Sequence, residues 1–149
     1  DKGAPTLLSL LDTCAISMGT RWLRYCLHHP LTDRTIAAAR HGAIAALLDP
    51  DGSQPLAKLI TLLAGVADVE RIGTRIALKS ARPRELAALR ETLHQLPAIT
   101  DALAGSTGLL ETLSNDLAIP ADCLAHLERT VAGDPPALPS AMSVAPSPQ

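Results

Sequence analysis

The stretch Asp68-Val-Glu-Arg-Ile-Gly-Thr-Arg-Ile-Ala-Leu-Lys-Ser-Ala-Arg-Pro-Arg-Glu-Leu86 decides the fold, because it predicts two helices on either side of a sharp break. In its first half, three apolar residues recur at the spacing of one helix face: Val69, Ile72 and Ile76. Acidic residues open this segment and a basic residue closes it, as the helix dipole favours, so we expect a helix over 68–79. The break at 80–83 ends in Pro83, which suits the first turn of the next helix.

A leucine seam marks this next helix, which we expect to end near residue 96. The four leucines share one helix face, and they are Leu86, Leu89, Leu93 and Leu96. Such a seam can also receive a partner helix, which would make the chain a free-standing interaction module.

Charged residues crowd the same stretch and form its candidate site. They are Asp68, Glu70, Arg71, Arg75, Lys79, Arg82 and Arg84. Two interpretations remain open, because the basic side chains either pair with neighbouring carboxylates in a structural ion network or contact a DNA phosphate backbone. Pairing is the simpler interpretation, since the net charge of the chain is −2 and it has no aromatic stacking partners near the cluster.

The composition favours helices over sheets. The chain has 149 residues, of which 47% are apolar but only 1% aromatic, so leucine, isoleucine and alanine must form the core. We therefore expect an all-α protein, an irregular multi-helix bundle of roughly six or seven helices over 1–132, followed by a disordered Pro/Ser-rich tail over 133–149. The remaining helices are expected at 17–28 with Ser17 as N-cap, 33–48, 55–63, 99–117 and 121–132, whereas 1–16 should be irregular or extended. The apolar side of the helix at 17–28 should carry Met18, Trp22, Leu23 and Cys26.

Motifs for catalysis and cofactor binding are absent from the sequence. It has no P-loop of the form Gly-x-x-x-x-Gly-Lys-Ser/Thr and no nucleophile elbow, so we expect neither an enzyme nor a bound cofactor. Cys14, Cys26 and Cys123 form no Cys-x-x-Cys pair, and the single close pair of Cys26 and His29 falls short of a zinc site, so no metal is expected. Reduced thiols and the lack of a long apolar run favour a cytoplasmic protein with no membrane partner.

Several short blocks, taken in order, resemble the core domain of the MutS family of DNA mismatch-repair proteins. The resemblance covers residues 6–97 and fades from 98 to 138. The matching blocks are Thr6-Leu-Leu-Ser-Leu-Leu-Asp12, Met18-Gly-x-Arg21, Leu27-His-His-Pro-Leu31, Arg40, Ile44-x-x-Leu47, Asp68-Val-Glu-Arg71, Arg75 and Ala81-Arg-Pro-Arg-Glu-Leu86. No single block is decisive, but their common order at compatible spacing is specific.

The resemblance implies a part of a protein that finds mismatched DNA and uses ATP and Mg²⁺ to signal repair. In that family a Phe-x-Glu motif in another domain reads the mismatch, and an ABC-type domain with a P-loop hydrolyses ATP. The part matched here is the helical hub that couples the two, so Arg75 and Arg82 are implied to be structural and not catalytic. The chain would then be a fragment or a truncated product. Its implied partners are the other domains of a MutS-type protein, and DNA is reached only through the full-length protein.

We therefore expect a structural coupling segment that neither hydrolyses ATP nor selects mismatches by itself. Two alternatives remain, a free-standing helical module that binds a partner helix along the leucine seam, and a small helical DNA-binding domain that uses the break at 80–83 as its corner. A hub separated from its neighbours exposes faces that should be buried, so we also expect marginal stability or self-association.

Overall fold

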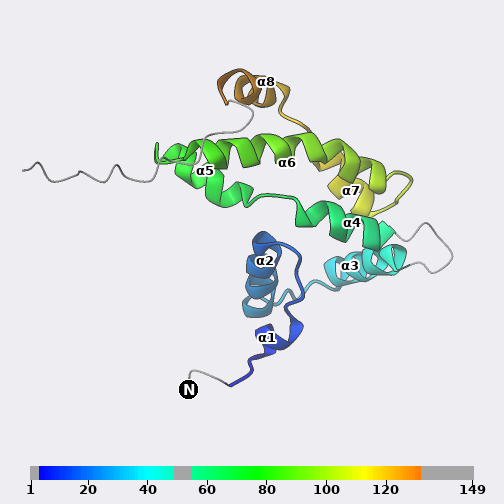
Figure 1. Ribbon diagram of the computed structural model, residues 1–149. Coiled ribbons are helices and arrows are strands. Elements are labelled where there is room, and N and C mark those ends of the chain that lie inside the picture. Colours follow the sequence, from blue (N-terminus) through cyan, green and yellow to red (C-terminus); the bar gives the residue numbers. More distant parts are fainter. Residues whose placement is uncertain (1–3, 49–54, 132–149) are drawn as a thin grey trace, which may run out of the picture.

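The computed structural model describes residues 4–48 and 55–131, and the regular structure in these residues is α-helical (Figure 1). In chain order the helices are α1 (Leu7–Leu11), α2 (Ser17–His28), α3 (Arg34–Leu47), α4 (Pro55–Ala64), α5 (Val69–Ala77), α6 (Pro83–Ala102), α7 (Leu109–Asp116) and α8 (Ala121–Thr130). The all-α class is confirmed. The predicted tail over 133–149 lies outside the described residues.

Helix α6 is the longest helix of the described residues, and the packing is arranged around it (Figure 1). Helices α4, α5, α7 and α8 all contact α6, while α3 packs on α7 and α1 packs on α2. The predicted helix start at Pro83 is confirmed. Figure 1 shows α1 and α2 on the side of α5 that faces away from α8.

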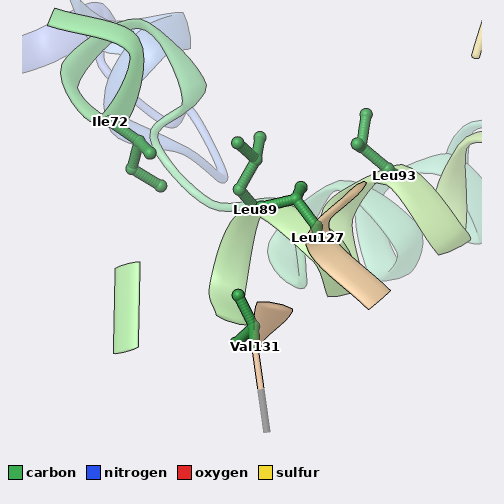
Figure 2. Packing of buried hydrophobic residues seen from close by; sticks show 5 residues of the cluster. All are labelled: Ile72, Leu89, Leu93, Leu127 and Val131. Atoms are coloured by element: carbon green, nitrogen blue, oxygen red, sulfur yellow. The ribbon is translucent and has the colours of Figure 1, made fainter. Parts of the chain in front are cut away.

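One apolar cluster joins α5, α6 and α8 (Figure 2). Its buried side chains are Ile72, Leu89, Leu93, Leu127 and Val131. The hydroxyl of Thr92, which is also buried, accepts the Ala67 backbone N–H at 2.9 Å and donates to the Ala88 carbonyl at 2.9 Å. Each buried leucine or isoleucine contributes about 1.5–3 kcal/mol, so this cluster holds α5 and α8 against α6.

A second apolar cluster joins α4, α6 and α7, and α3 packs against its edge. Its buried side chains are Leu59, Ile99, Leu103 and Leu110. Leu96 of α6 packs against both clusters, so α6 connects them into one layer of helices. The layer holds the corner between α5 and α6 in place.

The expected end of α6 near residue 96 is wrong, since the helix continues through Pro97 to Ala102. Pro97 has no N–H to donate to the carbonyl one turn earlier, which disfavours a helix interior. The helix persists because Ile99 and the C-cap Leu103 are buried against α4 and α7. The single helix expected over 99–117 is wrong for the same reason, and a turn with positive φ at Gly105 (80°) and Gly108 (65°) separates α6 from α7.

The N-terminal expectations also need correction. Residues 7–11 form α1, because the side chains of Thr6 and Ser9 each accept the other's backbone N–H, at 3.1 and 2.9 Å, and so cap the helix. Ser17 is the first residue of α2 and not its N-cap, which is Ile16. Trp22 does not lie on a buried face, since its side chain is 59% exposed and stacks on Tyr25 at 5.5 Å between ring centroids.

Candidate functional site

The predicted charged cluster begins at the corner where α5 gives way to α6. At the end of α5, the Lys79 N–H donates to the Ile76 carbonyl at 2.9 Å and the Ser80 N–H donates to the Arg75 carbonyl at 2.8 Å. This pair of hydrogen bonds is a Schellman motif, which needs a left-handed residue just after the helix. That residue is Lys79, with φ of 53°, at a position that glycine adopts at lower cost. The sharp turn therefore requires a strained backbone conformation at Lys79.

Glu85 fixes the other side of this corner, in the first turn of α6. Its carboxylate accepts the Arg82 backbone N–H at 2.8 Å and pairs with the Arg75 guanidinium at 3.2 Å. The hydrogen bond from the Arg82 N–H, followed by the charges of Arg75, Arg82 and Arg84, holds the pKa of Glu85 below its usual value. The half-buried pair of Arg75 and Glu85 thus ties α5 to α6.

A second group of charges joins α5 to α2. Asp68 caps α5, since its carboxylate accepts the Arg71 backbone N–H at 3.1 Å. The same carboxylate receives two hydrogen bonds from Arg21, at 2.7 and 2.8 Å, and one from the Ser17 hydroxyl at 2.8 Å. Glu70 adds a contact of 3.2 Å to Nε of Arg21. We call Ser17, Arg21, Asp68 and Glu70 the α2–α5 clasp.

The two acidic members of the clasp, Asp68 and Glu70, differ in how strongly they bind Arg21. The hydrogen bonds from Arg21 hold the pKa of Asp68 well below its usual range, and those to Asp68 and Glu70 raise the pKa of Arg21. The Asp68 side chain is 21% exposed and is bound at both oxygens, whereas the Glu70 side chain is 70% exposed. Bidentate pairs are strong and exposed pairs are screened by water, so Asp68 is the main anchor of α2.

Sequence reasoning missed Arg21 as a member of this site. It stands 47 residues before Asp68, so no local spacing rule pairs the two. Its one signal in the sequence is its place in the Met18-Gly-x-Arg21 block of the family resemblance. Arg21 follows Ser17 by four residues on α2, so both side chains lie on one helix face and reach the same carboxylate.

The other basic residues of the predicted set make no ion pair within the part of the chain that the structure describes. They are exposed, and they are Arg71, Lys79, Arg82 and Arg84. The neighbouring carboxylates are already bound to Arg21 and Arg75, so this group keeps uncompensated positive charge. We call these four residues the basic corner.

The leucine seam is occupied within the chain. Leu89 and Leu93 are buried against α5 and α8, and Leu86 and Leu96 pack against the same clusters. A module that receives a partner helix on this seam is therefore not supported, because α5 and α8 already cover it.

The histidines and cysteines do not gather into a metal site in the described ranges. No group of three or more His, Cys, Asp or Glu side chains there is placed to hold a metal ion. Of the close pair in the sequence, Cys26 lies 3.8 Å from the Arg40 guanidinium and the His29 ring stacks on Tyr25 at 4.3 Å. Across the same residues, every helix is too short or too polar to cross a membrane.

The sequence of this chain matches the model of a known protein family. The model of the family MutS domain III matches residues 1–145 of the chain. The match extends beyond the segment 6–97 that carried the sequence resemblance, and it includes the clasp and the basic corner. Domain III is not the ATPase domain of that family. Because the match spans nearly the whole chain, the protein belongs to the MutS family of DNA mismatch-repair proteins, whose domain III it carries.

Proposed function

We propose that this chain is the structural segment that links mismatched-DNA binding to ATP hydrolysis in a MutS-type protein, and that it has neither activity by itself. The observation that carries the proposal is the attachment of α2, which contributes no buried side chain and is held to α5 by the clasp. In contrast, two apolar clusters hold α4 to α8 together.

The clasp suits a coupling role because its bonds are directional. A bidentate pair of an arginine and a carboxylate forms only in one relative orientation of the two groups, so it is sensitive to a displacement of α2. Coupling between remote sites needs an element with discrete arrangements that both sites can bias. Movement of α2 relative to α5 would make or break the contact between Arg21 and Asp68, and this gives the hub two arrangements.

The N-terminal helices also expose apolar side chains that suit contacts with the other domains of such a protein. These side chains are Leu7, Leu10, Leu11, Trp22 and Tyr25. Scattered exposed leucines are ordinary, but a group on two adjacent helices favours an interdomain contact.

A complementation experiment tests the coupling role. A MutS-type protein that lacks its domain III is mixed with this chain, and ATP hydrolysis is measured with matched and with mismatched duplex DNA. We expect hydrolysis to respond to the mismatch only when the chain is present, and the chain alone to hydrolyse no ATP. Binding of the chain to the other domains is followed separately by fluorescence anisotropy.

The variant Arg21→Met separates coupling from simple assembly, because it breaks the clasp and leaves the apolar clusters intact. We expect it to bind the other domains while the response to the mismatch is lost. Arg34→Met, on an exposed position of α3 outside the clasp, is the matched control and should behave as the unaltered chain. An Arg21→Met chain that restores the full response would rule out the clasp as the coupling element.

A further inference from the structure

An exposed leucine, Leu78, directly precedes Lys79 of the basic corner. Leu78, the C-cap of α5, is 71% exposed, the highest fraction among the large apolar side chains of the described residues. Arg71 and Arg75 precede it by seven and three residues, so the three share one side of the helix. Leu78 therefore stands among basic side chains and not on the Ile72 face, which is turned to the core.

The basic corner carries a local excess of positive charge in a chain whose net charge is −2. Residues 68–86 carry five basic and three acidic side chains, and all three carboxylates are engaged by Arg21 or Arg75. From residue 91 to residue 128 there are six acidic side chains and no Lys or Arg. The corner is thus a local excess of positive charge beside an exposed apolar side chain, and residues 21–40, with four arginines and one aspartate, form another basic stretch.

We propose that the basic corner binds an acidic polypeptide segment that carries an apolar side chain among its carboxylates. Three of its four basic residues are arginines, whose planar fork donates two parallel hydrogen bonds to a carboxylate. Leu78 would give the apolar side chain of the partner a contact that excludes water. Recognition of acidic motifs by arginine clusters is a known mode of peptide binding.

A nucleic-acid backbone fits the same corner less well. A self-contained binder of phosphates carries a basic excess, whereas this chain has a net charge of −2. Binding of single strands relies on aromatic stacking, and the chain's aromatic side chains, Trp22 and Tyr25, lie on α2. Phosphate contacts would also leave the exposed Leu78 unused.

The first test measures binding by the whole 149-residue chain. The probe is a short fluorescein-labelled peptide rich in Asp and Glu with one central leucine, and the readout is anisotropy. The variant Arg71→Gln/Arg82→Gln/Arg84→Gln should weaken binding about tenfold, because each pair at an exposed site is worth up to about 1 kcal/mol. The control Arg34→Gln/Lys58→Gln/Arg129→Gln removes the same charge from exposed positions elsewhere and should change binding less than twofold. Equal losses in both variants would overturn the proposal.

The second test concerns the leucine, and it does not depend on the triple variant being folded. Leu78→Ser should weaken binding of the leucine peptide but not of a peptide with serine in its place. If duplex DNA of equal charge binds the unaltered chain more tightly than the peptide does, the corner is a nucleic-acid site and the proposal is wrong. The corner would bind such a segment whether or not the chain couples the two activities, so the two proposals fail independently.

Discussion

At the scale of single residues, Asp68 both caps α5 and anchors α2, and two substitutions separate these roles. Asp68→Asn keeps an effective N-cap but removes the charge that Arg21 binds. Asp68→Ala removes the cap as well, so it should be less stable than Asp68→Asn by about 1 kcal/mol. Urea denaturation at neutral pH checks the order, with the unaltered chain the most stable of the three. Equal stability of the two variants would mean that the cap contributes nothing.

The same carboxylate predicts a dependence on pH. The pKa of Asp68 is depressed in the folded state relative to about 3.9 in an unfolded chain, so the folded state binds fewer protons than the unfolded state. The contribution of Asp68 to the free energy of unfolding is therefore fully present above about pH 4, and it is lost as the pH falls through the depressed pKa. The stability difference between the unaltered chain and Asp68→Asn should shrink in that acidic range. The other carboxyls with a lowered pKa, Asp12, Asp33 and Glu85, cancel in this difference.

Lys79 offers a gain in stability at a single residue. It adopts φ of 53°, where a Cβ clashes with the backbone and glycine does not. Lys79→Gly should raise the free energy of unfolding by about 1 kcal/mol, while Lys79→Ala should give no such gain. Thermal denaturation of the three chains side by side measures the effect. A glycine variant that is less stable than the alanine variant would show that the left-handed turn is not formed in solution.

At the scale of elements, Pro97 should limit the stability of α6. Proline is about 3 kcal/mol less favourable than alanine inside a helix, and part of this is offset because it restricts the unfolded chain. Pro97→Ala should therefore raise the free energy of unfolding by about 1–2 kcal/mol. Pro83→Ala is the control, since Pro83 sits in the first turn of the same helix and its substitution should give no gain. A loss of stability in Pro97→Ala would indicate that the proline shapes a needed bend.

The starts of α3, α5 and α6 were predictable from the sequence, whereas the start of α1 and the end of α6 were not. Helices were expected to begin at Asp33 and Asp68, which are the N-caps of α3 and α5, and Pro83 opens α6 as expected, because capping and proline geometry depend on a few neighbouring residues. The end of α6 depends on the burial of Ile99 and Leu103 against helices distant in sequence. No local signal carries that information.

At the scale of the whole molecule, the sequence identified two of the four clasp residues, Asp68 and Glu70. The acidic half was visible as a charged cluster at the start of a helix. The partner Arg21 was not, because the contact forms only once α2 is placed against α5. The exposure of Trp22 has the same origin, since α2 meets the rest of the molecule through polar side chains. An amphipathic pattern shows which residues share a face but not which face is covered.

The balance of buried and exposed apolar side chains predicts how the isolated chain behaves. In the described residues nine apolar side chains form the core, while fourteen large ones are exposed. Burying that surface against a second copy is favourable, so the midpoint of thermal unfolding should rise with protein concentration. Leu10→Ser/Trp22→Ser, which alters the exposed N-terminal helices, should weaken the concentration dependence and keep the helical content. Leu113→Ser, at an exposed site on α7, should leave it unchanged. A sharp transition at the same temperature at every concentration, in a chain that sediments as a monomer, would exclude self-association and show that the two apolar clusters suffice for a stable fold.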